Sequence, residues 1–312
     1  MQAHKSFIVI IGGANMDIHG QPGRTLELHD SNPGSVKNSP GGVARNIAEN
    51  IARLGNDSRL IAPIGRDHAG RMLLQQGIDA GIDMQHIVEM DTSGTSSYLS
   101  ILDENGALLA AISDMSILEH LGPDQLQIHQ DMLRRAALII IDTNLRADTL
   151  AYVMENFSDQ PIFVDPVSCS KASKLLPHLK AIHTLKPSLS EAEEIAGLKA
   201  DSPKQLPTLA DWFHRQGVKR MFISLGAKGL FYSTGDGQGQ IEAITPSEQI
   251  YTNGAGDALL AGLAHAWLRQ WPLLPSIHFA MSAACLTLSH PATIHPDMST
   301  PNVTQINERH YA

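Results

Sequence analysis

The sequence predicts an α/β fold in which a mostly parallel central sheet carries helices on both faces. Short apolar runs such as Phe7–Gly12 are typical of strands buried on both sides. Segments such as Ala44–Leu54 repeat apolar residues at helical spacing and end at Gly55, a residue suited to a helix C-terminus. Strand-like and helix-like segments alternate along the chain, which favours parallel strands joined by helical crossovers.

The same alternation continues through most of the chain. Further strands are expected at Arg59–Ile64, Ala137–Asp142, Ile162–Asp165, Ile182–Leu185 and Met221–Leu225. Further helices are expected at Ala69–Ala80, Ala147–Asn156, Ser190–Gly197, Thr208–Gly217 and Ala258–Trp267. We therefore expect residues 1–312 to form a single domain.

Two segments interrupt this alternation, at residues 18–39 and 95–112. The first is polar and rich in Gly, Pro, Asn and Asp, and the second has two β-like runs around Asn105-Gly106, a hairpin signal. Both follow strands of the expected core. They could be plain surface hairpins, or together they could form a small β-sheet lid over a substrate. Its exposed edges would also favour pairing between two copies, so we expect a homodimer through the lid.

Composition excludes several classes of protein. The chain of 312 residues has a net charge of −9 and no basic cluster, so no nucleic-acid partner is expected. No apolar stretch is long enough to cross a membrane, and no signal peptide is evident at the N-terminus. Cys169 and Cys285 lack neighbours at metal-ligand spacing. We expect buried free thiols and a cytoplasmic protein.

The strongest local feature is the run Gly254-Ala255-Gly256-Asp257 at the start of an expected helix. Small residues at a helix N-terminus let an anion approach unpaired backbone N–H groups. A carboxylate in the same turn suits a base that takes a proton from a hydroxyl while those N–H groups hold a phosphoryl group. Taken alone, the run fits a capped helix start better.

Two N-terminal motifs suit a polar substrate. Gly41 and Gly42 precede the helix that carries Asn46 in its first turn, where its amide could bond a hydroxyl. Asn15 and Asp17 follow the first strand, where α/β sheets place ligand contacts, and Asp17 could accept bonds from a diol. Each also has a plain structural reading, as a Gly-Gly turn and as an Asx turn.

A third motif, Ser224-Leu225-Gly226-Ala227-Lys228-Gly229, gives a glycine-lined strand end that could accept a nucleotide. Neither a Walker A motif nor a dinucleotide-binding Gly-x-Gly-x-x-Gly is present. These absences disfavour a P-loop kinase and an oxidoreductase.

Taken together, these motifs resemble the ribokinase, or PfkB, family of carbohydrate and nucleoside kinases, over most of the chain. The N-terminal family pattern is matched by Gly41, Gly42, Ala44, Asn46, Ala48, Gly55 and Gly65. The core of the C-terminal pattern is matched by Gly254 to Asp257. The resemblance implies a ribokinase-like three-layer α/β/α fold with a small β-sheet lid, and transfer of phosphate from ATP to a hydroxyl with Mg²⁺.

The resemblance also implies roles for single residues. Asp257 would be the catalytic base. An anion hole would be formed by Gly254, Ala255 and Gly256. The substrate would be held by Asn15, Asp17, Gly41, Gly42 and Asn46. The nucleotide site would include Lys186, Ser188, Glu191, Ser224, Gly226 and Gly229, with Glu191 acting indirectly on Mg²⁺.

Within that family the chain is most similar to the bacterial pseudouridine kinases. The similarity is carried by Asp30–Gly34, Thr95–Ser100, Asp165–Ser168 and Ile182–Pro187. It implies phosphorylation of the 5′-hydroxyl of pseudouridine. Ser31 and Asn32 are candidate readers of the base, whose polar edges need partners once they leave water.

Three positions depart from the family pattern. Ser188 replaces an Asn, Asn253 takes a position usually held by Thr, and Tyr251 stands where many members have an Asp that helps hold a monovalent cation. A requirement for such a cation therefore stays open. So do a kinase for ribose, another nucleoside or another sugar, and a non-catalytic nucleoside-binding protein of the same fold.

Overall fold

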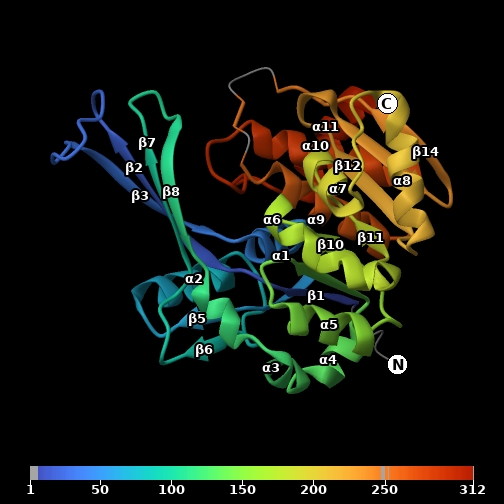
Figure 1. Cartoon of the computed structure of the whole chain (residues 1–312), viewed down its shortest axis with the longest axis horizontal. Helices are drawn as coiled ribbons and strands as arrows, with labels where there is room; N and C mark the ends of the chain where they lie inside the picture. Colours follow the sequence, from blue (N-terminus) through green and yellow to red (C-terminus); the bar gives the residue numbers. More distant parts are fainter. Residues whose placement is uncertain (1–5, 247–249, 252, 312) are drawn as a thin grey trace.

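A central eight-stranded sheet runs through the computed structural model, which describes residues 6–246, 250–251 and 253–311 (Figure 1). Its strand order is β14-β13-β12-β11-β10-β9-β1-β4. The strands are β1 (Phe7–Ile11), β4 (Asp57–Ile61), β9 (Leu138–Asp142), β10 (Ile162–Asp165), β11 (Thr184–Leu185), β12 (Arg220–Ser224), β13 (Leu230–Thr234) and β14 (Gly237–Ile241). All neighbours from β4 to β12 pair in parallel, whereas β13 and β14 add an antiparallel hairpin at one edge.

Helices cover both faces of this sheet, as expected for strands buried on two sides. In β1 the side chains alternate, so that Ile8 and Ile10 belong to one hydrophobic cluster and Val9 and Ile11 to the other. The first cluster includes residues of α1 (Val43–Arg53), α2 (His68–Asp79), α9 (Ala255–Leu268), α10 (Leu273–Leu288) and α11 (Thr300–Tyr311). The second includes residues of α3 (Pro123–Gln127), α4 (Gln130–Arg135), α5 (Ala147–Asn156), α6 (Cys169–Ala172), α7 (Leu189–Ala196) and α8 (Leu206–Arg215).

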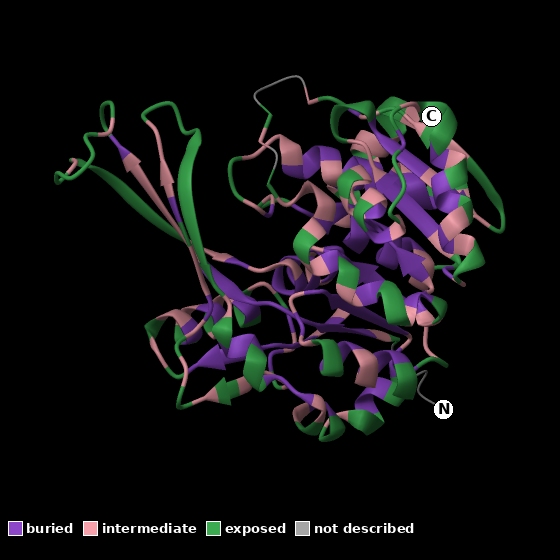
Figure 2. Cartoon of the chain, viewed as in Figure 1, coloured by how far each residue is buried: buried purple, intermediate pink, exposed green. Residues whose placement is uncertain are grey.

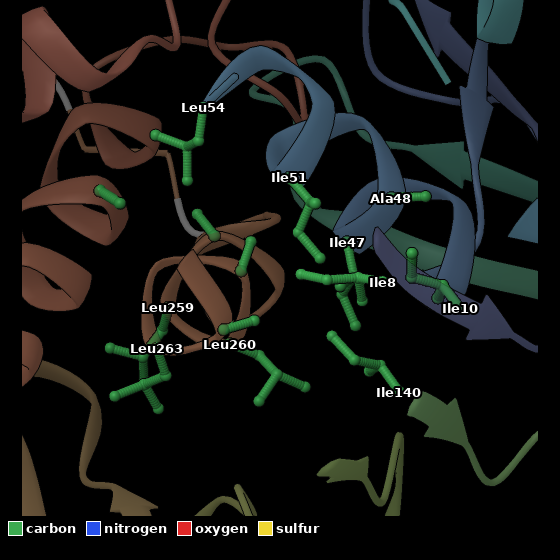
Figure 3. Packing of buried hydrophobic residues seen from close by; sticks show 14 of the residues in the cluster. Ile8, Ile10, Ile47, Ala48, Ile51, Leu54, Ile140, Leu259, Leu260 and Leu263 are labelled. Atoms are coloured by element: carbon green, nitrogen blue, oxygen red, sulfur yellow. The ribbon is translucent and has the colours of Figure 1, made fainter. Parts of the chain in front are cut away.

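Helices α1 and α9 pack against each other and cover the same face of the sheet, above β1 and β9. Figure 3 shows Ile47 and Ile51 of α1 close to Leu260 of α9, with Ile8 and Ile140 of the sheet beneath them. These side chains are buried, and their removal from water stabilises the contact. Because the two helices are fixed to the same strands, their N-terminal ends are fixed relative to each other.

A separate four-stranded sheet projects from this body as an arm (Figure 1). Its strands, in the spatial order β3-β2-β7-β8, are β2 (Asn15–Pro22), β3 (Gly34–Gly41), β7 (Ser97–Leu102) and β8 (Leu108–Asp114). They contain the two segments expected to form a β layer, and the hairpin around Asn105-Gly106 is present as β7–β8. The sheet is longer than residues 18–39 and 95–112 suggested, since β2 already begins at Asn15.

The arm has one polar and one apolar face, because side chains alternate along each strand. Asp17 lies opposite Ser39 and Tyr98, so these three side chains share a face. Ile18 lies opposite Leu99, which lies opposite Ile112, and these share the other face. Figure 2 shows that β3 and β8 are largely exposed along the arm, in contrast to the buried central strands.

Most of the expected helices are confirmed to within two or three residues. The expected strand Arg59–Ile64 is instead divided into β4 and β5 (Pro63–Gly65), because Pro63 lacks the N–H needed to continue the ladder. Strand β5 pairs in parallel with β6 (Val88–Met90) in a small third sheet. Within the ranges described above, no helix is long and apolar enough to span a membrane.

Candidate active site

Polar residues gather at one edge of the central sheet, among them Asn15, Lys186 and Ser224, which the sequence analysis singled out. Asp142 ends β9, Asp165 ends β10 and Ser224 ends β12, while Lys186 directly follows β11. Asn15 lies four residues after the end of β1. Since these strands are parallel, their carboxyl ends lie at the same edge, which is where α/β sheets bind ligands.

Helix α9 begins at this edge, with Gly254 as its N-cap. Gly254 has φ of +78°, and a Cβ here would collide with the carbonyl oxygen of Thr293, so a glycine is required. The first-turn N–H groups, which include those of Ala255 and Gly256, have no acceptor within the helix. Asp257 lies in the same turn with only 9% of its surface exposed. A buried carboxylate thus adjoins a group of backbone donors.

Asn46 of α1 reaches Asp257 across the site. Its Nδ2 donates a hydrogen bond of 2.9 Å to Asp257 Oδ2, and both side chains are buried. Helix α1 has Gly42 as its N-cap at φ of +99°, where a Cβ would meet the backbone of Gly13 and Ala14. The two glycine-rich turns found in the sequence therefore stand face to face, each supplying one partner of this bond.

Asp142 holds the start of α1 in place. Its Oδ2 accepts hydrogen bonds from the N–H groups of Gly13, at 2.9 Å, and Ala44, at 3.0 Å. Its Oδ1 accepts one from the N–H of Asn144, at 2.8 Å. Burial raises the pKa of Asp142, although the hydrogen bonds from Gly13 and Asn144 oppose the rise. This residue was not among the predicted site residues.

Lys186 is the cation of the site. Its Nζ lies 2.9 Å from Asp165 Oδ2, and both side chains are buried. Burial disfavours the Lys186 ammonium, but attraction to Asp165, and then to Asp257 and Glu191, outweighs it and raises its pKa. A Cβ at Gly256 would lie 3.0 Å from Lys186 Nζ, so the ammonium stands against the first turn of α9. Lysine and helix N-terminus together favour an anion here.

The charges around Asp257 change how it titrates. Burial first, and repulsion by Asp165 second, raise its pKa to about 7. The Asn46 hydrogen bond and the Lys186 charge act in the opposite direction. A carboxyl group with a pKa near neutrality is matched to taking up a proton at that pH.

Asp17 and Asn15 lie on β2 where the arm joins the body. Asn15 Nδ2 donates to Asp17 Oδ1 at 2.6 Å, and Gly41 of β3 leaves space against the Asp17 carboxylate. Burial raises the pKa of Asp17, while Asn15, and to a smaller extent His19 and Arg45, lower it. The partly buried carboxylate can accept hydrogen bonds from a polar ligand.

A cavity of about 430 Å³ adjoins the start of α9. Ser188, Ser224, Gly226 and Gly229 line it, as do the anion-hole residues Ala255 and Gly256. The rest of its wall is largely apolar, with Ile244, Leu259, Met281, Cys285 and Leu288. A mostly apolar cleft that opens onto backbone donors is suited to a nucleotide, with its base in the cleft and its phosphates at the helix.

Ser188 and Glu191 form the N-terminal cap of α7. Ser188 Oγ accepts from the N–H of Glu191 at 3.3 Å, and Glu191 Oε2 accepts from the N–H of Ser188 at 2.8 Å. The Glu191 carboxylate is also among the charges that raise the pKa of Lys186.

The two residues predicted to contact the nucleobase lie on the arm. Ser31 and Asn32 lie in the exposed loop between β2 and β3, at the free end of the arm (Figure 1). Asn32 is engaged within that loop, since its Nδ2 donates to the carbonyl oxygens of Glu27 and Asp30. Their assignment to the base stays a prediction.

Sequence reasoning missed Asp142 and Asp165 as members of the site. Both are single Asp residues at the carboxyl ends of apolar runs, Ile139-Ile140-Ile141 and Ile162-Phe163-Val164. An Asp close to the end of an apolar strand is also the pattern that indicates Asp17, so this pattern predicts all three residues.

An anion-binding helix start with a buried carboxylate, beside a nucleotide-sized cleft on a parallel sheet, defines a small-molecule kinase that phosphorylates a hydroxyl group. A family comparison agrees, since residues 5–301 match the model of the pfkB family of carbohydrate kinases. The chain belongs to this family.

Individual known proteins are also similar to this chain. The chain is 39% identical over 304 residues to the pseudouridine kinase of Escherichia coli K12, covering 97% of both chains. It is 34% identical over 302 residues to the uncharacterized sugar kinase YeiI of the same organism, covering 97% of this chain and 83% of the relative. Arabidopsis thaliana ribokinase, solved with ribose and ATP, shares the fold with a TM-score of 0.88 at 19% identity, covering 97% and 99% of the two chains.

The raised pKa of Asp257 predicts that this residue destabilises the folded protein. Its pKa of about 7 exceeds the unfolded value of 3.8. The contribution of this group to the free energy of unfolding is therefore most favourable below pH 4 and is lost as pH rises through 7. We expect Asp257→Asn to increase the free energy of unfolding by about 1–3 kcal/mol at pH 8. The gain should vanish near pH 4. Urea unfolding of both proteins at pH 4, 6 and 8 measures this, and a constant difference would contradict it.

Proposed function

We propose that the protein phosphorylates the 5′-hydroxyl of pseudouridine with ATP, giving pseudouridine 5′-phosphate. The observation that carries the proposal is the position of Asp257, which is buried at the start of α9 and faces Asn46. The choice of pseudouridine is supported by the relative from E. coli that bears this activity in its name.

In this mechanism Asp257 acts as the general base. It would accept the proton of the attacking hydroxyl as the oxygen bonds to the γ-phosphorus and the bond to ADP breaks. Asn15, Asp17, Gly41, Gly42 and Asn46 would position the substrate, with Asp17 accepting hydrogen bonds from the ribose diol. Holding both reactants in line supplies much of the rate enhancement.

The charge that develops on the phosphoryl group would be stabilised by the start of α9. The N–H groups of this turn, at Gly254, Ala255 and Gly256, form the proposed anion hole, and Lys186 lies against it. Residues of the cleft, namely Ser188, Ser224, Gly226 and Gly229, would hold the nucleotide. Mg²⁺ would neutralise phosphate charge, with its ligands mostly from phosphates and waters, and Glu191 would act on it through water.

The arm would act as a lid on a single domain of residues 1–312. Its polar face carries Asp17, so this face is the one turned to the substrate. Exclusion of water by the lid would suppress hydrolysis of ATP. Both cysteines are free thiols, which fits a reducing compartment such as the cytoplasm.

The opposite face of the arm supports a homodimer. Val36 and Ile112 are exposed to 73% and 68% of their surfaces, and Leu99 lies between their strands on the same face. An exposed apolar face of this kind marks a protein interaction site. Packing two arms face to face would cover both, and a symmetric pair is the commonest arrangement.

The role of Asp257 predicts the effect of removing its charge. Asp257→Asn should lower kcat by about 10²–10⁴-fold, because an amide cannot take up the hydroxyl proton. In the unmodified enzyme kcat/KM should rise with pH through about 7, as Asp257 ionises. Coupled ADP-release assays from pH 5.5 to 9 measure both, and nucleoside binding by calorimetry should persist in the variant. A variant as fast as the parent would remove Asp257 from the mechanism.

Substrate choice is tested with a panel of pseudouridine, uridine, adenosine, ribose and fructose under the same assay. We expect kcat/KM to be highest for pseudouridine, with phosphorus NMR placing the phosphate on the 5′-oxygen. Faster turnover of ribose or adenosine would overturn this assignment while leaving the kinase intact. ATP hydrolysis without any acceptor serves as the blank.

The dimer predicts that a charge on the apolar face of the arm separates the subunits. Ile112→Lys and Val36→Lys should each reduce the mass measured by light scattering from that of two chains to that of one. Lys37→Glu is the matched control, because Lys37 lies opposite His19 on the polar face. A parent protein that is already a monomer at micromolar concentration would contradict the proposal.

A further inference from the structure

Arg45 is a buried arginine next to Asn46, the hydrogen-bond partner of the proposed base, and the proposed mechanism gives it no role. It occupies the first turn of α1, next to Asn46, and only 3% of its surface is exposed. A buried guanidinium is costly unless it is paired, and removing one partner of such a pair is strongly unfavourable. The position therefore needs an explanation beyond packing.

The Arg45 side chain makes two polar contacts, and the first of them is extended by a neighbouring ion pair. Its Nη2 forms an ion pair with Glu49 on the next turn of the helix, and Glu49 is almost equally buried. Glu49 Oε1 also accepts from Arg53 Nε at 2.7 Å, so the pair is extended toward the C-terminal end of α1. At the other end, Arg45 Nη1 lies 3.4 Å from Asn46 Oδ1.

The contacts at the two ends of the Asn46 amide set how it is turned. The amide has a donor end and an acceptor end, whereas a guanidinium can only donate and a carboxylate can only accept. With Oδ1 toward Arg45 and Nδ2 toward Asp257, both ends meet a suitable partner. The reverse orientation would set NH₂ against guanidinium and oxygen against carboxylate. The Asn50 side chain bonds the Asn46 carbonyl oxygen and so leaves the amide free to turn.

We propose that Arg45 is a positioning residue, which fixes the Asn46 amide so that its N–H groups face Asp257 and the substrate. This inference rests on the proposed function, in which Asp257 is the base. It also determines what Asn46 can offer a ligand. With its oxygen turned to Arg45, Asn46 presents only a donor to the site, so the sugar oxygen that it contacts must be an acceptor.

The other charged groups around Asp257 belong to the central sheet, whereas Arg45 belongs to α1. Asp142 and Asp165 lie at strand ends, and Lys186 follows β11. Asp165 is paired with Lys186 and Asp142 with backbone N–H groups. A change at Arg45 therefore alters the hydrogen bond to Asp257 while these three groups keep their partners. It also removes a charge that lowers the pKa of Asp17.

The test compares Arg45→Met and Arg45→Lys with Arg53→Met. In Arg45→Met the amide is free to turn its oxygen toward Asp257, so the acid limb of the kcat/KM profile should move to higher pH. We expect kcat to fall about 10–100-fold, as for a small misplacement of a reacting group, with a smaller change in KM. Arg45→Lys retains a donor cation and should recover part of the rate.

Arg53→Met is the matched control. It also removes a cationic partner of Glu49 but makes no contact with Asn46, so its pH profile should match that of the parent. The double variant Arg45→Met/Glu49→Gln removes the unpaired buried charge and should show the same shifted limb with a recovered melting temperature. Circular dichroism verifies folding of each variant.

The inference is overturned if folded Arg45→Met, or the folded double variant, keeps the parent pH limb and kcat. It is also overturned if Arg53→Met shifts the limb to the same extent, since the cause would then be the charge of Glu49. Asp257→Asn separates the two levels. If Asp257→Asn stays active, the assignment of Asp257 as the base is wrong. If Asp257→Asn is inactive and Arg45→Met behaves as the parent, only the positioning role of Arg45 is wrong.

Discussion

The hydrogen bond between Asn46 and Asp257 joins residues 211 positions apart in the chain. It can form only because α1 and α9 start at the same edge of the sheet and pack on the same strands. Asp142 accepts hydrogen bonds from the N–H of Ala44 in α1 and from that of Gly13 after β1, which joins the start of α1 to the sheet. Gly254 lets the chain enter α9 with a backbone that other residues would strain. The geometry of the site thus follows from the core beneath it.

The charges and hydrogen bonds around the three buried carboxylates explain why Asp257 has a pKa near neutrality. Asp142, Asp165 and Asp257 are all buried, and each is satisfied by a different kind of partner. Backbone N–H groups hold Asp142, and the Lys186 ammonium holds Asp165. Asp257 has a neutral amide as its hydrogen-bond partner and the other two carboxylates nearby, so its pKa rises to about 7. A carboxyl group with a pKa raised in this way makes the fold less stable at neutral and higher pH, and such groups are common at active sites.

How far the sequence predicted this site depends on the kind of signal. Glycine-rich turns before helices are local features, so Gly42 and Gly254 could be found, and the residues near them followed. The alternation of strand-like and helix-like segments is also a local feature, and it predicted the layered fold. Contacts across the sheet are not local: the Arg45–Asn46–Asp257 row depends on which helices become neighbours, and the sequence around Arg45 shows only a charged residue in a helix. Ser31 and Asn32 were predicted as polar residues of the lid, and their position relative to a ligand depends on how the exposed loop that carries them is placed.

The arm connects the chemistry of the site to the surface of the molecule. Because a strand directs alternate side chains to opposite faces, the same β2 that presents Asp17 to the site presents Ile18 to the other side. In the proposed function the polar face contacts the ligand, whereas Val36, Leu99 and Ile112 are exposed on the face that a second copy would cover. A shift of register by one residue would exchange the two sets, since it turns every side chain to the opposite face. Covering the apolar face would therefore also stabilise the register on which the position of Asp17 depends.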